Sequence, residues 1–363
     1  MKAAVLREIG GPFLIEDVDI DAPNAHEVLI DVKASGLCHS DLLYAQRGGI
    51  PVPIVMGHEV AGVVRAVGDA VTVFQPGDHV VGCIVRACFN CAHCRNGKPY
   101  QCEHPDAVER PADAPSRLRQ GDENIAGFFS MSGFAEQMLA HENQLVRVPE
   151  DIPFDRACLL GCAVATGMGS ALNTGQVRVG DTVAVFGCGG VGLNVVQGAA
   201  LAGARRIIAI DPVADKRELA ERFGATHTVD PLAADAVDAV IALNHGEGVD
   251  KAFEVAGRKD TFAQAVNVLG PQGIVLTVGV QRMNDPASVK IEKGVREPQH
   301  GIRGVHMGST NPRIDLPFYA ELYQQGRLNL DDLVSTRIAL ADINEAYANL
   351  EAGKVARAVI VFD

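Results

Sequence analysis

The strongest constraint on the fold is a change of apolar rhythm about halfway along this 363-residue chain. Between residues 182 and 278, continuous apolar runs such as TVAVF, RIIAI and GIVLTV alternate with segments of helical spacing, such as GVGLNVVQGAALAG. Continuous apolar runs are typical of strands buried on both faces. Strands that alternate with helices of this length predict an α/β fold with a parallel, doubly wound sheet of the Rossmann type.

The first 150 residues follow a different pattern. Short alternating segments, for example EVLIDVKASG and HEVAGVVRAVG, are separated by glycine and proline, which predicts an antiparallel, barrel-like β domain. After residue 310 we expect two helices and a last strand, ARAVIVF, which returns to the first domain. The expected organisation is a β-rich domain over residues 1–163, a doubly wound domain over 164–309 and a returning segment over 310–363.

The turn after the first strand of the doubly wound domain has the pattern G-x-G-x-x-G. Its glycines permit a tight turn and a close approach of the backbone to a pyrophosphate, and the following helix offers free N–H groups at its N-terminus. The turn follows a strand and opens a helix, which is the context that a dinucleotide site requires. The predicted phosphate-binding residues are Gly187, Gly189, Gly190, Val191 and Gly192.

The residue that ends the next strand selects the dinucleotide. Asp211 lies 19 residues after Gly192. A carboxylate at this place accepts hydrogen bonds from the ribose hydroxyls and repels the 2′-phosphate of NADP, so we predict NAD. Lys216, five residues on, either contacts the same ribose or is a solvated helix lysine.

Four of the nine cysteines lie within fifteen residues. The N-terminus lacks the apolar core and cleavage site of a signal peptide, so we expect the protein in the cytoplasm, where thiols stay reduced. An odd number of cysteines also argues against a complete disulfide set. Four close thiolates surround one tetrahedral zinc and leave no open position, which predicts a structural zinc; an iron–sulfur cluster and a redox relay are the alternatives. The predicted ligands are Cys88, Cys91, Cys94 and Cys102.

The net charge of -13 and the scattered Lys and Arg disfavour a nucleic-acid partner, because phosphate backbones require a basic patch. The uncharged segment over residues 182–204 is long enough to span a bilayer. However, six glycines divide it into a strand, a turn and a helix, so we expect no membrane span. A small-molecule substrate is therefore the expected partner.

Five motifs occur in an order that matches one known family: GLCHSD, MGHEVAG, the four-cysteine segment, GCAVATGMGSAL and VFGCGGVGLNVV. Together they resemble the zinc-dependent medium-chain alcohol dehydrogenases, and the resemblance extends over nearly the whole chain. It leans towards the bacterial aryl and benzyl alcohol dehydrogenases. It implies a GroES-like catalytic domain and a Rossmann coenzyme domain.

The resemblance also implies a second, catalytic zinc. Cys38, His58 and Cys162 match its three protein ligands, a set that leaves a fourth position open. Glu59 matches a carboxylate that eases ligand exchange, and Asp41 matches the carboxylate that orients the His58 ring.

The resemblance assigns the remaining site residues by position. Ser40 matches the hydroxyl that receives the alcohol proton, but Leu43 stands where many members have a histidine that completes the proton relay. His39 and Arg357 match basic residues at the pyrophosphate. The positions that match contacts to the nicotinamide are Thr166, Val278 and Val280, and those that match the substrate pocket are Ile84, Phe128 and Phe129.

The implied reaction is the oxidation of a primary, hydrophobic or aromatic alcohol to its aldehyde, and the reverse reduction. Zinc acidifies the alcohol hydroxyl, and the alcohol then gives a hydride to NAD. The alternative is a formaldehyde dehydrogenase that acts on a thiol adduct, for which Arg110, Arg117 and Arg119 would supply a basic patch. Because the sixth strand of such sheets often pairs across a two-fold axis, we expect a homodimer or homotetramer.

Overall fold

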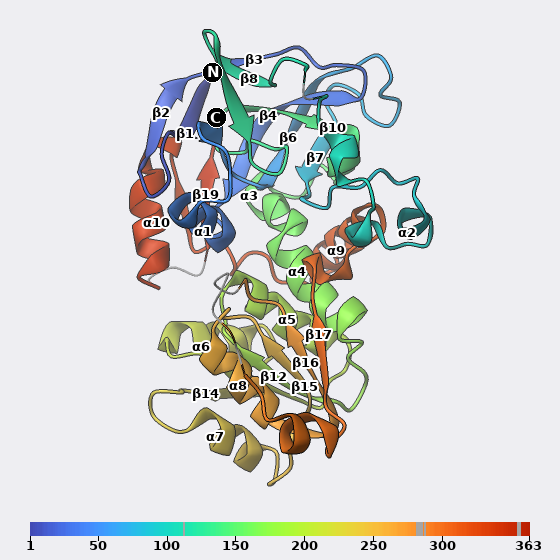
Figure 1. The fold of residues 1–363 in the computed structure, drawn as a ribbon, viewed down its shortest axis with the longest axis vertical. Helices are drawn as coiled ribbons and strands as arrows, with labels where there is room; N and C mark the ends of the chain where they lie inside the picture. The colour runs from blue at the N-terminus through green and yellow to red at the C-terminus, as the bar shows by residue number, and fades with distance from the viewer. Residues whose placement is uncertain (112, 281–285, 287, 354–356) are drawn as a thin grey trace. The chain divides into compact units, whose positions relative to one another are not determined.

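The computed structural model describes residues 1–111, 113–280, 286, 288–353 and 357–363. The chain forms two compact units, one of Met1–Cys162 with Asn311–Asp363 and one of Ala163–Thr310. Each unit has its own sheets (Figure 1).

The first unit is built on β-sheet. A seven-stranded sheet has the order β11-β7-β6-β4-β19-β18, and β10 also pairs with β4. Its strands are β4 (Glu27–Gly36), β6 (Glu59–Val67), β7 (His79–Gly82), β10 (Gln137–His141), β11 (Leu145–Arg147), β18 (Thr336–Ile338) and β19 (Ala358–Val361). Except for the pair β18 and β19, the pairings are antiparallel. The predicted last strand is thus β19, which pairs with β4.

A second sheet of this unit has the order β2-β1-β5-β9-β8-β3. Its strands are β1 (Lys2–Leu6), β2 (Phe13–Asp17), β3 (Asp19–Ile20), β5 (Ile54–Val55), β8 (Leu118–Gln120) and β9 (Glu123–Gly127). The α-helices of the unit are α1 (His39–Arg47), α2 (Ala92–Arg95), α3 (Phe154–Ala157), α9 (Pro312–Gln324) and α10 (Ile343–Glu351). Buried side chains from β1, α10 and β19 share one apolar cluster, which holds the C-terminal segment in the unit.

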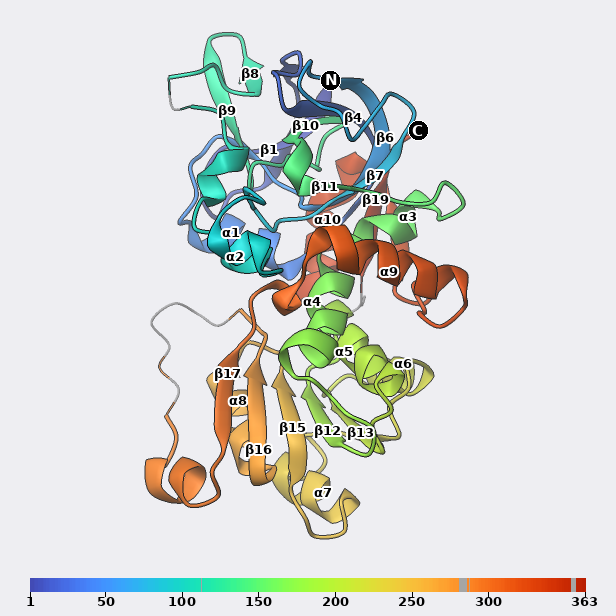
Figure 2. The ribbon, with the colours of Figure 1, turned by 90° about the vertical axis from the view of Figure 1, so that its right-hand side faces the viewer.

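The second unit is a parallel sheet with the order β14-β13-β12-β15-β16-β17 (Figure 2). Its strands are β12 (Thr182–Phe186), β13 (Arg206–Ile210), β14 (His227–Val229), β15 (Val249–Glu254), β16 (Leu269–Thr277) and β17 (Gly301–Gly304). Its α-helices are α4 (Ala163–Gly169), α5 (Gly190–Leu201), α6 (Ala214–Arg222), α7 (Ala236–Leu243) and α8 (Lys259–Asn267). The strand order 3-2-1-4-5-6 is that of a doubly wound dinucleotide-binding sheet, so the predicted fold class is confirmed.

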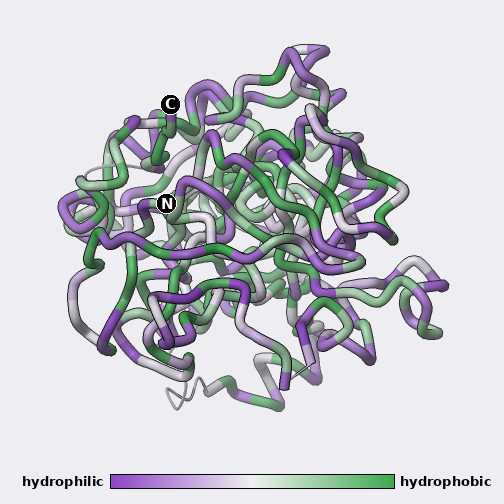
Figure 3. Tube along the Cα trace, turned by 90° about the horizontal axis from the view of Figure 1, so that it is seen from above, coloured by the Kyte–Doolittle hydropathy of each residue, from purple (hydrophilic) through white to green (hydrophobic). Residues whose placement is uncertain are grey.

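Hydrophobic and hydrophilic segments alternate along the trace (Figure 3), and the apolar strands of both units supply the buried core. Within the described part of the chain, no helix taken singly has both the length and the apolar composition of a membrane span. One bent pair of helical segments, Phe154–Gly161 and Ala163–Thr174, reaches that length and composition when the two are taken together.

Candidate metal and dinucleotide sites

Strand pairing brings distant candidate ligands together. The end of β4 at Gly36 lies opposite Glu59 at the start of β6. Cys38 follows β4 by two residues, so this register places its thiol beside His58. The ligand atoms of Cys38, His58, Glu59 and Cys162 all lie within 4.8 Å of one another, and all four residues are buried.

Asp41 fixes the orientation of the His58 ring. The His58 Nδ1 atom lies 3.1 Å from Asp41 Oδ1 and 3.0 Å from Oδ2, and the Gly57 backbone N–H donates to Oδ1 at 3.1 Å. A carboxylate at Nδ1 places the ring proton there and leaves the Nε2 lone pair free to bind a metal. Nε2 lies 3.3 Å from Cys162 Sγ, so this lone pair is directed into the cluster.

Interactions within the buried cluster favour the thiolate form of Cys38, which is the form that binds a metal. A hydrogen bond with Cys162 lowers the pKa of Cys38 well below its usual range, with a further contribution from His58. The same thiol contact, together with burial, raises the pKa of Cys162. In the absence of a cation, therefore, only one of the two sulfurs is readily ionised.

Arg357 lies behind this cluster rather than on an exposed surface. The Leu37 N–H donates to the carbonyl of Ala358 in β19, and Arg357 Nη1 donates to the Leu37 carbonyl at 2.8 Å. The same nitrogen lies 3.3 Å from Glu59 Oε1. Burial raises the pKa of Glu59 to about 7, although the Arg357 guanidinium opposes this shift. The contact of Arg357 with the pyrophosphate stays a prediction.

The donor set fits a zinc ion. Two sulfurs and one imidazole are a ligand set that catalytic zinc uses in proteins, and the Glu59 carboxylate lies in the same cluster. The buried donor atoms are close enough to bind one ion in common. A cation would also stabilise the thiolate of Cys162, whose pKa burial and the contact with Cys38 raise.

Helix α1 carries Ser40, predicted to receive the alcohol proton, and His39, predicted at the pyrophosphate. Ser40 Oγ lies 3.0 Å from Cys38 Sγ, which places its hydroxyl at the edge of the cluster. His39 is the exposed first residue of the helix, and Leu43 is half-buried on it. The structure therefore brings Ser40 into contact with a candidate ligand, whereas His39 faces outward at the start of the helix.

The four clustered cysteines form a second candidate metal site. Their sulfurs also lie within 4.8 Å of one another. Backbone N–H groups of Asn90 and Cys91 donate to Cys88 Sγ at 3.3 and 3.2 Å, and those of Cys88 and His104 donate to Cys102 Sγ at 3.2 and 3.3 Å. Such bonds stabilise thiolates. Four sulfur donors form a closed tetrahedral set that fits a structural zinc.

The glycine turn of the second unit has the geometry of a phosphate cradle. Gly187 has a φ of +99°, and a Cβ atom on Gly192 would lie 1.9 Å from the Gly187 carbonyl oxygen. Around Gly189 there is open space, and this residue caps α5. Gly187 is thus required by its left-handed backbone and Gly192 by its close approach to Gly187, while Gly189 leaves the backbone open to a ligand.

Asp211 stands beside this turn at the end of β13. Its Oδ2 accepts the Cys188 N–H at 2.8 Å and its Oδ1 accepts the Val213 N–H at 2.9 Å. Each carboxylate oxygen has a further lone pair, so the group can still accept ribose hydroxyls. Lys216 lies on α6. The backbone N–H of Val278 donates to the Glu254 carbonyl, whereas Val280 is exposed.

Thr166 lies on α4, where a strained segment packs against it. Thr166 Oγ1 lies 3.6 Å from the Met307 sulfur, and Thr310 Oγ1 donates to the Ala165 carbonyl at 3.0 Å. Three consecutive residues, Met307 to Ser309, have positive φ angles. Sequence reasoning missed this segment, because only its glycine signals a left-handed backbone.

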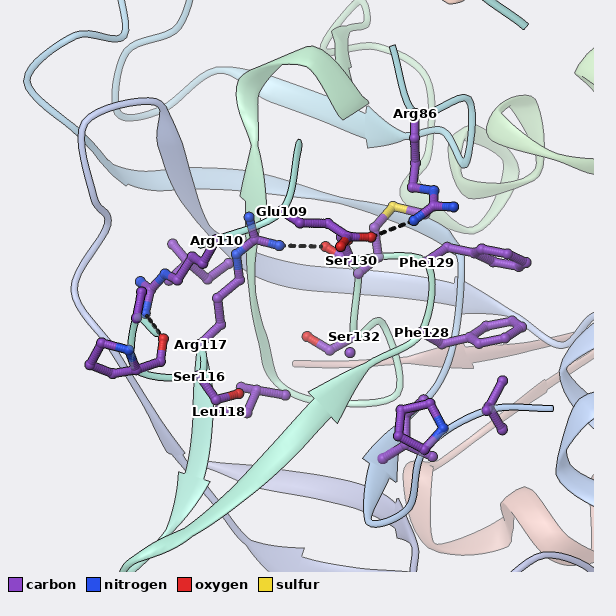
Figure 4. A pocket seen from close by; sticks show the side chains of 18 of the residues that line it. Arg86, Glu109, Arg110, Ser116, Arg117, Leu118, Phe128, Phe129, Ser130 and Ser132 are labelled. Atoms are coloured by element: carbon purple, nitrogen blue, oxygen red, sulfur yellow. Dashed lines mark hydrogen bonds and ion pairs between the residues drawn. The ribbon is translucent and has the colours of Figure 1, made fainter. Parts of the chain in front are cut away.

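Aromatic side chains surround the candidate zinc ligand His58. The ring centroids of Phe128 and Phe129 lie 5.9 and 6.3 Å from that of His58. Both phenylalanines line a cavity of about 490 Å³ (Figure 4). Tyr44, which sequence reasoning missed, also lines it. Ile84 does not, since it packs against another apolar cluster of the unit. The place of Ile84 in the substrate pocket stays a prediction.

The structure does not favour the predicted basic patch. Arg110 pairs with Asp21 and Glu27, Arg117 pairs with Glu27, and Arg119 pairs with Asp21. Two carboxylates are thus shared among the three guanidinium groups, which disfavours a site for an anionic thiol adduct there. Burial raises the pKa of Glu27, but hydrogen bonds from Arg110 and Arg117 outweigh it and bring the value to about 2.

This low pKa predicts an acid-sensitive contribution to stability. The pKa of Glu27 is about 2 in the fold and 4.5 in its usual range, so its contribution is complete above pH 4.5 and is lost as the pH falls towards 2. We expect Glu27→Gln to lower the free energy of unfolding at pH 7 by at most about 3 kcal/mol. Urea denaturation between pH 3 and 7 measures this difference. A difference between wild type and variant that does not shrink below pH 4.5 would contradict the assignment.

Comparison with known proteins agrees with this geometry. Residues 24–150 match the family model of the alcohol dehydrogenase GroES-like domain, and residues 190–322 match that of the zinc-binding dehydrogenases. The NDMA-dependent alcohol dehydrogenase of Amycolatopsis methanolica is 39% identical over 99% of this chain and 98% of its own.

Solved structures are similar over the full length. An alcohol dehydrogenase zinc-binding domain protein from Burkholderia ambifaria has a TM-score of 0.94 at 37% identity, covering 100% of this chain and 98% of its own. The benzyl alcohol dehydrogenase of Acinetobacter calcoaceticus has a TM-score of 0.93 at 32% identity, covering 100% and 99%. The chain therefore belongs to the zinc-dependent medium-chain alcohol dehydrogenases and is an alcohol oxidoreductase.

Proposed function

We propose that the protein oxidises primary alcohols with an aromatic or other bulky apolar group to their aldehydes, with NAD as hydride acceptor, and catalyses the reverse reduction. The observation that carries this proposal is the buried cluster of two thiols and one oriented imidazole. Beside its imidazole stand the rings of Phe128 and Phe129, which we call the aromatic wall. A zinc ion bound there would supply a Lewis acid that lowers the pKa of an alcohol hydroxyl from roughly 16 to about 7.

The chain's own residues have three roles in this reaction. Cys38, His58 and Cys162 would hold the ion, and Asp41 keeps the His58 ring in the orientation that directs Nε2 into the cluster. Ser40 accepts the alcohol proton at its Oγ atom. Ser40 would release its own hydroxyl proton as it accepts this one, and with Leu43 in place of a histidine, His39 or the ribose of a bound cofactor would be the next acceptor. The four-cysteine site supports the fold and takes no part in the chemistry.

The second unit would bind the NAD. The glycine turn and the N-terminus of α5 provide N–H groups for the pyrophosphate, and Asp211 provides acceptors for the ribose hydroxyls. The proposed nicotinamide contacts are Thr166 and the backbone at Val278 and Val280. NDMA dependence, as named for the Amycolatopsis methanolica relative, makes the hydride acceptor the first property to measure.

Asp211 predicts the dinucleotide preference. We expect the wild type to use NAD at least about tenfold better than NADP in kcat/KM, because the carboxylate repels a 2′-phosphate. Asp211→Asn keeps an acceptor oxygen but removes the charge, so the preference should fall by about tenfold or more. Asp215→Asn, four residues further on, is the matched control and should leave the preference unchanged. A wild type that prefers NADP would exclude the role given to Asp211.

Benzyl alcohol and NAD provide the test of the reaction itself. We expect NADH to appear with benzyl alcohol, and a polyol such as glucitol to be a poor substrate. Absence of NADH with a range of primary alcohols, in a protein that contains zinc, would contradict the proposal.

The assembly is also a proposal. Strand β17 is at the edge of the parallel sheet, and its Ile302 side chain is 47% exposed. An edge strand offers N–H and C=O groups to another strand, which supports a homodimer or homotetramer built on this edge.

The location in the cytoplasm is proposed from the cysteines. All nine are free thiols in the fold. Those outside the two candidate metal sites are Cys83, Cys158 and Cys188, and the others are the candidate ligands described above. Free metal-binding thiols require a reducing compartment, which supports the cytoplasm.

A further inference from the structure

The loop that carries the two phenylalanines has a strained backbone. We call residues Phe128–Ser132 the aromatic turn. Phe129 and Ser130 have φ angles of +53° and +63°, a left-handed region that side chains other than glycine rarely adopt. Such a conformation persists only where the surroundings hold it. A short backbone bridge between Phe128 and Met131 closes the turn from within.

Two side chains from elsewhere in the sequence bind the strained peptide groups. Gln144 Nε2 donates to the Phe129 carbonyl at 2.8 Å, and Arg117 Nη1 donates to the Ser130 carbonyl at 3.1 Å (Figure 4). Gln144 is fully buried. Both left-handed residues are thus fixed through their carbonyl oxygens.

Arg117 is itself rigidly held. Its Nε donates to Glu27 Oε1 at 2.7 Å, and its Nη2 donates to the Val108 carbonyl at 2.7 Å. Its side chain is 14% exposed. The planar guanidinium therefore joins three acceptors in a fixed geometry, which a lysine cannot reproduce.

The backbone of the aromatic turn determines where the Phe128 and Phe129 rings lie. The rings of Phe128 and Phe129 lie 4.2 Å apart between centroids, and both face the His58 ring. Arg117, Phe129 and Ser130 also line the cavity of about 490 Å³, so this side of the turn has room to relax. Because an aryl group packs against aromatic rings at preferred angles, a shift of the turn changes the fit of aromatic substrates.

We propose that Arg117 and Gln144 are positioning residues that hold the aromatic turn and thereby set the preference for aromatic over small alcohols. The inference rests on the proposed function, since it specifies the alcohol that the same site accepts. The hydrogen bonds of both side chains described above go to the turn, to Glu27 and to Val108, so their loss should affect substrate fit rather than zinc binding.

The test compares benzyl alcohol with ethanol in Arg117→Met. We expect kcat/KM for benzyl alcohol to fall about tenfold, mainly through KM, as is usual for a poorer pocket fit. The value for ethanol should change less than about twofold, and zinc per chain should stay equal to wild type. Gln144→Met should likewise lower kcat/KM for benzyl alcohol and leave the value for ethanol nearly unchanged.

Arg110→Met is the matched control. Arg110 also pairs with Glu27, but its backbone contacts are the carbonyls of Pro115 and Ala22. This variant removes the same charge and leaves the aromatic turn held, so its ratio of benzyl alcohol to ethanol should equal that of wild type. Ser130→Gly in the Arg117→Met background should recover part of the ratio, because glycine adopts the left-handed backbone without strain.

The outcomes distinguish failure of the positioning role from failure of the proposed function. An unchanged ratio in both Arg117→Met and Gln144→Met would overturn the positioning role, as would an equal loss in Arg110→Met. If Arg117→Met does not fold, Arg117→Lys takes its place, because it keeps the charge beside Glu27. The same difference between benzyl alcohol and ethanol is expected. A wild type that contains zinc but oxidises neither alcohol would instead refute the proposed function.

Discussion

Replacing Cys162 with alanine is expected to leave one zinc per chain and to lower kcat for alcohol oxidation by at least about 10⁴-fold. The loss is large because lowering the pKa of an alcohol from roughly 16 to about 7 corresponds to roughly 12 kcal/mol. Without the second thiolate, the ion loses one of its three proposed ligands. Metal analysis and NADH formation, measured on the same sample, test both parts.

Cys158→Ala is the matched control for this variant. Cys158 is also buried and lies four residues before Cys162, but its thiol donates to the Asp155 carbonyl and is not part of the cluster. We expect it to retain two zinc ions and more than half of the wild-type activity. Two zinc ions in Cys162→Ala would show that the buried cluster is not a metal site.

Replacing Cys94 with alanine is expected to have the largest effect on stability. Structural zinc sites contribute about 10–16 kcal/mol of binding free energy in small domains, and part of this energy stabilises the fold. We expect the variant to contain only the catalytic zinc and to lose about 4 kcal/mol or more of its free energy of unfolding. Urea denaturation and metal analysis provide the measurement.

Cys83→Ala is the matched control, because Cys83 is also buried but belongs to neither cluster. Burial raises the pKa of the Cys83 thiol to about 12. Iron in place of zinc in the wild type, or equal stability of Cys94→Ala and Cys83→Ala, would contradict the assignment of a structural zinc.

Local patterns were sufficient to predict most of the fold. The strand order of the second unit follows from the alternation of apolar strands and helices together with the glycine turn. The four-cysteine cluster was predictable for a similar reason, because its ligands are close in sequence and their spacing is visible. The scattered cluster of Cys38, His58 and Cys162 was predicted only through the family resemblance, since pairing of β4 with β6 brings the first two together.

Long-range contacts explain the errors and omissions. The sequence suggested a basic patch at Arg110, Arg117 and Arg119, because nothing near them in sequence shows that they pair with Asp21 and Glu27. Likewise, no local signal marks the contact of Gln144 with Phe129. The positive φ of Phe129 could not be predicted either, because glycine is the usual signal of a left-handed backbone and this position is a phenylalanine.

The most direct test of the central claim is to follow zinc content and benzyl alcohol-dependent NADH formation while a chelator removes the metal from the wild type. We predict two zinc ions per chain before the chelator is added. Activity should disappear in proportion to the loss of one of them and return when zinc is restored. Undiminished activity in a chain that has lost both ions would contradict the claim that the Cys38, His58 and Cys162 site is the catalytic centre.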